Sequence, residues 1–239
     1  STDETSSLIE ALLPQYLERG HNIKHITRAQ RTGYKAGALK EGLVSAQGAF
    51  IAIFDADFLP DPLWLKRTIP FFKNPEISTV QTRWAHINHN ASLLTKIQAF
   101  ALDIHFTLEQ LGRNTLGYFI NFNGTAGVWR KTAIRDAGNW QGDTLTEDLD
   151  LSYRAQLRSW KILYLPHIST PAELPMTIEA ARAQQFRWNK GGAENFQKSI
   201  RKVLHHPGLT RGQKFHGAVH LLSTTLFFQV FVPKVRLSG

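Results

Sequence analysis

The stretch AFIAIFDAD, residues 49–57, joins an apolar run to two acidic residues, and it decides the fold class. Residues 49–54 are typical of a buried strand in a parallel sheet. Asp55 and Asp57 then lie beyond the carboxyl end of that strand, where open α/β sheets bind their ligands. Two carboxylates one residue apart can share a hard divalent cation, which in turn can hold nucleotide phosphates. A solvated Asp-x-Asp turn is the alternative.

Helical and extended patterns alternate around this strand, which predicts an α/β fold with a mainly parallel central sheet and right-handed crossovers. Before it, the spacing predicts a helix over 5–18, a strand over 22–27 and a helix over 35–46. After it, we expect a strand over 77–87, a helix over 93–111, an extended segment over 118–130, a helix opened by 144–148, a strand over 161–165 and a helix from Met176 that Gly191 and Gly192 end.

Composition narrows the class of partner. The chain has 239 residues, no cysteine and a formal net charge of +9. The charge favours contact with an anion, such as lipid head groups or a phosphorylated substrate. No nucleic-acid-binding signature accompanies it, so we expect no nucleic acid partner.

The two ends of the chain predict different surroundings. Residues 1–205 form one predicted catalytic domain, and 206–239 a membrane-associated or transmembrane extension. Residues 215–232 contain no Lys, Arg, Asp or Glu, and a spanning helix needs about 20 mostly apolar residues. We therefore expect a membrane span there, with a buried or interfacial helix as the alternative.

A cluster of acidic residues, 147, 148 and 150, offers a general base. Thr144 and Glu147 fit a capping box, in which Glu147 folds back onto the helix start and leaves Asp148 free. Asp150 points away from Asp148 and has Arg154 at i+4 as a surface partner. We assign Asp148 as the base and Asp150 as structural. The alternative for Asp148 is simple stabilisation of a helix N-terminus.

A second group, Gln184, Arg187 and Trp188, shares one helix face at i, i+3 and i+4. The Arg187 guanidinium can grip a phosphate, and the Trp188 ring offers a flat surface for a sugar. Arg187 paired with a carboxylate beside a simply buried Trp188 is the alternative. Lys35, at the start of its predicted helix, could also meet a phosphate or be an ordinary exposed lysine.

Five short motifs in this order resemble a family 2 glycosyltransferase of the cellulose synthase and mannan synthase type: Lys35-Ala36-Gly37, Phe54-Asp55-Ala56-Asp57, Phe122-Asn123-Gly124-Thr125, Thr146-Glu147-Asp148 and Gln184-x-x-Arg187-Trp188. The resemblance covers roughly residues 1–205. It implies a GT-A-like, nucleotide-sugar-binding fold, a UDP- or GDP-hexose donor, Mg²⁺ or Mn²⁺, and inversion to a β-linkage at the cytoplasmic face of a membrane.

The resemblance also implies roles for single residues. Asp55 contacts the nucleotide and Asp57 the metal, with Asp55 sharing the metal site. Asp148 is the base, and Gln184 and Arg187 hold the diphosphate. The acceptor lies at Trp188 and at the segment Asn123, Gly124 and Thr125.

One departure from the family pattern is that the chain begins at Ser1, in a run that follows an earlier strand in family members. The N-terminal strands are therefore expected to be missing, and we predict a fragment that is weak or inactive by itself. The leading function is transfer of a sugar to a growing β-linked polysaccharide. Transfer of one sugar to a lipid carrier or short acceptor, and non-catalytic binding of polysaccharide at a membrane, are the alternatives.

Overall fold

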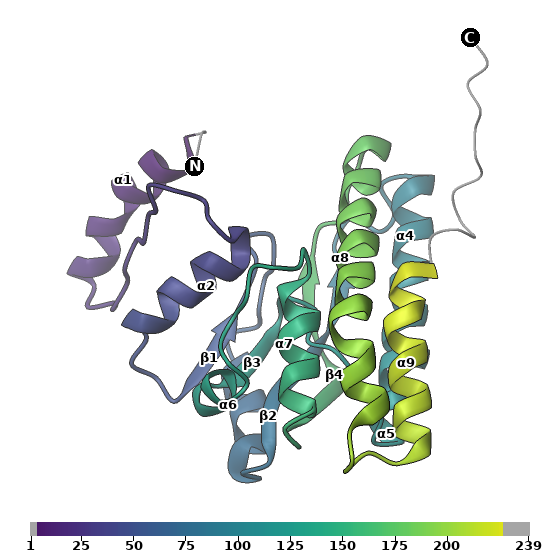
Figure 1. Ribbon diagram of the computed structural model, residues 1–239. Coiled ribbons are helices and arrows are strands. Elements are labelled where there is room, and N and C mark those ends of the chain that lie inside the picture. Colours follow the sequence, from purple (N-terminus) through teal and green to yellow (C-terminus); the bar gives the residue numbers. More distant parts are fainter. Residues whose placement is uncertain (1–3, 227–239) are drawn as a thin grey trace.

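The computed structural model describes residues 4–226 and has one four-stranded sheet flanked by helices (Figure 1). The strands are β1 (Phe50–Ile53), β2 (Ile77–His86), β3 (Gly127–Arg130) and β4 (Lys161–Ala172). The longer helices are α1 (Thr5–Glu18), α2 (Tyr34–Ser45), α4 (Leu93–Ile104), α7 (Glu147–Gln156), α8 (Ile178–His205) and α9 (Arg211–Leu226). Short helical segments are α3 (Trp64–Thr68), η1 (Ile69–Lys73), the π-helical η2 (His105–Gln110), α5 (Leu111–Thr115) and α6 (Lys131–Asp136).

The sheet is mixed, so the prediction of a mainly parallel sheet was wrong. Its order is β1-β3-β2-β4; β3 runs antiparallel to both neighbours, and β2 pairs with β4 in parallel. The strand predicted over 22–27 is also absent, since residues 21–28 have no regular structure and Ile23 and Ile26 are exposed. Without a burying partner, the apolar spacing of that segment does not suffice to form a strand.

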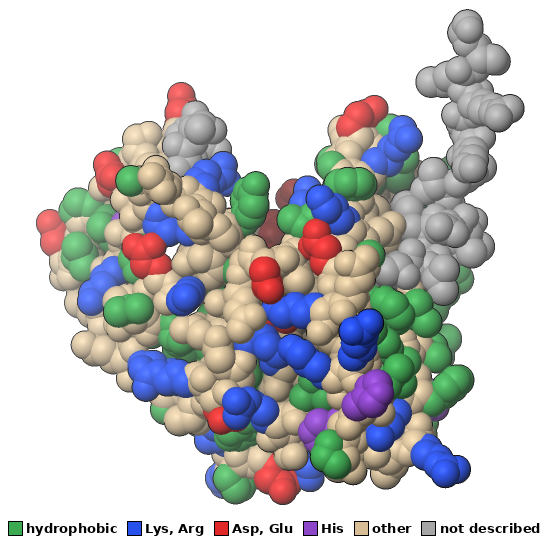
Figure 2. All heavy atoms as spheres, in the orientation of Figure 1, with side chains coloured by type: hydrophobic (Ala, Val, Ile, Leu, Met, Phe, Trp, Pro, Cys, Tyr) green, Lys and Arg blue, Asp and Glu red, His purple; other side chains and the backbone are tan. Residues whose placement is uncertain are grey.

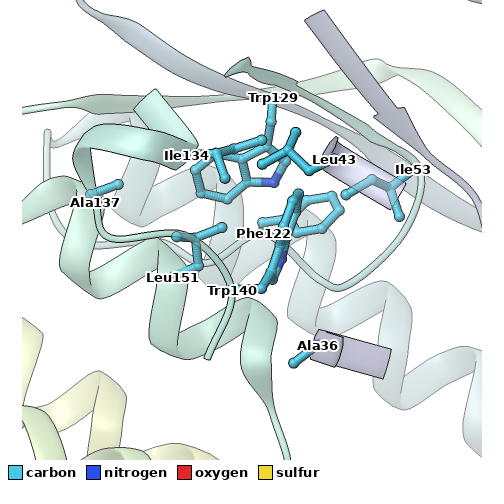
Figure 3. Close-up of a cluster of buried hydrophobic side chains, with 10 residues drawn as sticks. Ala36, Leu43, Ile53, Phe122, Trp129, Ile134, Ala137, Trp140 and Leu151 are labelled. Carbon is cyan, nitrogen blue, oxygen red and sulfur yellow. The ribbon is translucent and has the colours of Figure 1, made fainter. Parts of the chain in front are cut away.

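Neighbouring residues of β3 serve opposite faces of the sheet. Trp129 packs with Phe122, Trp140 and Leu151 in a core shared with α2, α6 and α7 (Figure 3). Val128 packs on the other side with Trp64 and other residues of α3, η1, β2 and β4. This follows from the two-residue period of a strand. This packing on both faces fixes β3, together with the preceding segment 123–126, between β1 and β2. Both of these strands end at the cavity described below.

Helix α8 passes through Gly191 and Gly192, where we had predicted a break. Both glycines are buried within the helix. A Cβ at Gly191 would lie 2.6 Å from side-chain atoms of Thr146, so this glycine permits a close approach between α8 and the start of α7. Glycine lowers helix propensity by about 1 kcal/mol relative to alanine, an amount that packing readily offsets.

The C-terminal helix α9 packs against α8 and α7 through a core that contains Tyr153, Val203 and Leu221. Within residues 4–226, no helix is both long enough and apolar enough to cross a bilayer. The rest of the predicted span, from residue 227 onward, lies outside the described residues. Helix α8 ends at His205, and the division of the chain at that point stays a prediction.

Candidate active site

Nine of the ten predicted site residues line a single cavity of about 700 Å³. They come from every part of the fold: Lys35, Asp55, Asp57, Asn123, Gly124, Asp148, Gln184, Arg187 and Trp188. The molecule is hollowed between α2 and α8, with acidic side chains in the depth of the hollow (Figure 2). Residues more than 100 positions apart therefore meet where β1, β2 and β3 begin or end.

The side of the cavity formed by β1 and α2 carries an ion pair. The Nζ of Lys35, in the first turn of α2, lies 2.5 Å from Oδ1 of Asp55 and donates to the Gly124 carbonyl at 3.1 Å. The Thr125 hydroxyl accepts from the Asp55 backbone N–H at 2.9 Å. Thr125 is buried and does not line the cavity. Its contact at the site is with the backbone of Asp55.

Asp57, two residues beyond Asp55, is exposed at the cavity. In the described part of the chain, no group of three or more His, Cys, Asp or Glu side chains is placed to hold a metal ion. The two carboxylates still fit Mg²⁺ or Mn²⁺, because such ions take oxygen ligands and complete their shell with substrate phosphates and water. Asp57 and Asp55 are the residues that would hold the cation.

Asp148 lies in the first turn of α7, and its Oδ1 accepts from the Leu149 backbone N–H at 2.9 Å. Burial raises the pKa of Asp148 to about 6, although that N–H and the Lys35 ammonium favour the ionised form. Burial and the adjacent Asp148 charge also raise the pKa of Glu147 to about 7. A base with a pKa near the working pH is suited to taking a proton in the transition state.

The start of α7 differs from the predicted capping box. The helix begins at Glu147 after the N-cap Thr146, whose side chain does not cap it, and the Thr144 hydroxyl donates to the Thr146 carbonyl at 3.4 Å. Glu147 is buried. Thr144 and Glu147 therefore do not form the predicted reciprocal pair.

Asp150 pairs with Arg154 as predicted, at 2.7 Å, but not at the surface. Asp150 is fully buried, and its second oxygen lies 2.8 Å from Nζ of Lys198 on α8. The sequence spacing identified Arg154 but could not reveal a partner 48 positions away.

Gln184, Arg187 and Trp188 line the cavity from α8. In Figure 1 this helix lies apart from α2, the helix that carries Lys35. The Arg187 guanidinium has no hydrogen-bond or ion-pair partner among the described residues, and Arg187 is exposed. The predicted alternative, an Arg187 paired with a carboxylate, is thus absent. A free guanidinium at a cavity is suited to a phosphate oxyanion.

Trp84 and His86, at the end of β2, line the same cavity and were missed by the sequence reasoning. The Trp84 and Trp188 ring centroids are 6.5 Å apart, at an interplanar angle of 52°. Trp84 Nε1 and His86 Nε2 are buried without a hydrogen-bond partner in the described chain. The signal in the sequence that could have identified Trp84 and His86 was their position at the end of the strand predicted over 77–87. Asp55 has the same position relative to its own strand.

The family described as "Glycosyltransferase like family 2" matches residues 1–191. The chain is 43% identical over 252 residues to glucomannan 4-beta-mannosyltransferase 9 of Arabidopsis thaliana, covering 99% of this chain and 47% of that protein. It is 39% identical over 258 residues to glucomannan 4-beta-mannosyltransferase 1 of Oryza sativa subsp. japonica, covering 98% and 50%. The chain thus spans about half the length of these relatives.

Solved structures share the fold. The mannosyltransferase PcManGT from Pyrobaculum calidifontis, in complex with GDP-Man and Mn²⁺, superimposes with a TM-score of 0.70 at 17% identity, covering 94% of this chain and 58% of that one. S. aureus TarS in complex with UDP-GlcNAc gives 0.66 at 16% identity, covering 95% and 62%. The fold is therefore the α/β fold of the GT-A type with a mixed sheet.

The chain belongs to glycosyltransferase family 2. Within it, the chain groups with the cellulose synthase and mannan synthase type, as the motif order indicated.

Proposed function

We propose that the protein carrying this chain transfers mannose from GDP-mannose to a growing β-1,4-linked polysaccharide, with inversion at the anomeric carbon. The sugar is suggested by the names of the curated relatives and the nucleotide by the GDP-Man complex that shares the fold. The observation that carries the proposal is one cavity bringing together Asp55, Asp148 and Arg187.

The donor diphosphate would lie between the Lys35–Asp55 pair and Arg187. Lys35 and Arg187 supply positive charge from opposite walls, and Gln184 adds an amide on the face of Arg187. A divalent cation held by Asp57 and Asp55 would supply further charge neutralisation on the leaving diphosphate. Charge placed in advance where it develops in the reaction lowers the barrier.

The acceptor sugar would pack on Trp188, and Asp148 would remove the proton from its attacking hydroxyl. As that oxygen bonds to C1 of the donor sugar, the bond between C1 and the diphosphate breaks, the proton passes to Asp148 and GDP leaves. A single displacement of this kind inverts the anomeric carbon, so an α-linked donor gives a β-linkage. Trp84, angled toward Trp188, offers a second ring surface for the polymer.

A membrane site is part of the proposal, with the active cavity on the cytoplasmic side. Apolar side chains at i, i+4 and i+7 are exposed on two helices: Leu93, Ile97 and Phe100 on α4, and Phe215, Val219 and Leu222 on α9. Figure 2 shows hydrophobic side chains along the edge formed by α9. Such rows, with a net charge of +9, suit the surface of an anionic bilayer.

The test is transfer from radiolabelled GDP-mannose and, in parallel, UDP-glucose, using membranes that contain the complete protein. We expect polymer labelled from GDP-mannose that an endo-β-1,4-mannanase degrades, and none from the Asp148→Asn variant. Label confined to a lipid or a single added sugar would support the non-processive alternative. GDP binding that is indifferent to both Mn²⁺ and Asp57→Ala would contradict the proposed donor site.

A further inference from the structure

One stripe of α8 contacts both the cavity and the segment that leads to Asp148. At 100° per residue, its members fall within an arc of about 120°. They are Gln184, Arg187, Trp188, Gly191, Glu194, Asn195 and Lys198. The first three and Glu194 line the cavity, and the last four contact residues 141–150.

The turn before α7 is hydrogen-bonded to α8 as well as to its own helix, where the Thr146 carbonyl accepts from the Asp150 backbone N–H at 3.2 Å. Glu194 accepts from the Leu145 backbone N–H at 2.7 Å. The Nδ2 of Asn195, a fully buried residue, donates to the Thr146 carbonyl at 3.0 Å and to its hydroxyl at 2.8 Å. The N-cap hydroxyl of Thr146 is therefore directed to α8, which explains why it does not cap α7.

Gly191 allows this contact. An added Cβ would lie 2.6 Å from both Oγ1 and Cγ2 of Thr146 and 2.8 Å from its backbone N. Thr146 cannot give way freely, because Asn195 holds its carbonyl and hydroxyl.

Lys198 completes the contact at the far end of the stripe. Its Nζ lies 2.8 Å from Asp143 in the preceding loop and 2.8 Å from the buried Asp150 in α7. It also donates to the Gln141 side chain at 2.9 Å. Loop and helix are thus joined to α8 on both sides of Asp148.

We propose that Gly191, Glu194, Asn195 and Lys198 are positioning residues that set the place of the Asp148 carboxylate relative to the diphosphate clamp on the same helix. This inference rests on the proposed function, in which Asp148 is the base and Gln184 and Arg187 hold the donor. The inference predicts that the turn 144–146 can be displaced while donor binding is kept. The reason is that Gln184 and Arg187 precede Gly191 on α8 and form no hydrogen bond with that turn.

The test compares kcat, the KM for GDP-mannose and the Kd for GDP with Mn²⁺ in the complete protein. For Asn195→Ala and Gly191→Ala we expect kcat to fall about 10²-fold, the effect of misplacing a reacting group by about 1 Å, with KM and Kd unchanged. Glu194→Gln retains an acceptor for Leu145 N–H and is expected to keep most of the activity that Glu194→Ala loses.

Two control variants make changes in side-chain size comparable to those of Asn195→Ala and Gly191→Ala. Ser199→Ala alters a buried residue one turn beyond Asn195, and Gly42→Ala adds a Cβ on α2 where nothing lies within 4 Å. Both are expected to leave kcat unchanged. A purely structural role would instead lower the melting temperature, kcat and GDP affinity together, and that result would overturn the inference, as would normal kcat in Asn195→Ala.

Hydrogen exchange supplies a readout that does not depend on activity. Amide exchange of residues 145–150 is expected to speed up in Asn195→Ala and not in Ser199→Ala. If the parent protein transfers no sugar, the proposed function fails, and exchange still decides whether α8 holds the turn. Unchanged exchange in Asn195→Ala would overturn that contact.

Discussion

Gly124 and Asp148 face each other so closely that a Cβ on Gly124 would lie 3.1 Å from Oδ2 of Asp148. Gly124 has φ +80°, a conformation that costs other residues about 1–2 kcal/mol. Its carbonyl also accepts from Lys35. One backbone segment thus lies beside the Asp148 carboxylate, the proposed base, and Lys35, the proposed donor-binding residue.

Gly124→Ala is therefore expected to lower kcat about 10²-fold by displacing the Asp148 carboxylate. Gly138→Ala is the matched control, because Gly138 has φ +85° and its nearest neighbours to an added Cβ are 3.6 Å away, outside the cavity. Both variants should lose similar stability in thermal melts. An equal loss of kcat in the two would show that backbone strain, and not contact with Asp148, is the cause.

The raised pKa of Asp148 predicts how stability depends on pH. An unfolded Asp ionises near pH 3.9, so between about pH 4 and pH 6 the folded protein binds more protons than the unfolded chain. The stabilising effect of this group is present at acid pH and is lost as pH rises through about 6. Asp148→Asn should consequently raise the melting temperature above that pH, with the gain shrinking toward acid pH. A gain independent of pH would contradict a buried carboxyl.

Asp150→Asn should destabilise the fold by about 3–5 kcal/mol, because it leaves the Arg154 and Lys198 charges without their buried partner. Glu76→Gln is the comparison, since Glu76 pairs with Lys161 at 2.7 Å in an exposed position where such a pair contributes about 0–1 kcal/mol. Urea denaturation measures both. Equal effects would indicate that burial of Asp150 does not matter.

Trp84→Ala is expected to raise the KM for a β-linked mannan oligosaccharide about 10-fold, equivalent to about 1.4 kcal/mol, because it removes one ring surface at the acceptor side. Trp84→Phe keeps a ring and should lose less. Neither change should alter the KM for GDP-mannose, which is measured in the same assay. A rise in the donor KM alone would place Trp84 at the donor instead.

Local spacing was enough to predict several of the residues that meet at the cavity, whereas Asn123 and Gly124 came from the family resemblance and Trp84 and His86 were missed. Asp55 and Asp57 follow from the end of an apolar strand, and Gln184, Arg187 and Trp188 from the helical period. These patterns depend only on neighbours in sequence. The cavity itself confirms that they lie together, while the role of each residue stays a proposal.

Contacts between distant segments were not predictable in this way. The direction of β3 depends on where residues 118–126 return to the sheet, so the sheet was wrongly expected to be mainly parallel. Gly191 suggested a helix break because its partner, Thr146, is 45 positions earlier in the chain. Burial of Asp150 depends likewise on Lys198 from another helix.

The register of β3 limits how the chain tolerates changes of length. Ile51 of β1 and Thr79 of β2 both lie opposite Trp129, so one residue fewer between Phe122 and Gly127 would exchange the faces of Val128 and Trp129. Trp129 and Val128 would then no longer pack in the two hydrophobic cores on the opposite faces of the sheet. Apart from Gly124, diversification of this loop is consequently more open to substitutions than to one-residue insertions or deletions, which are expected to abolish folding before they can change specificity.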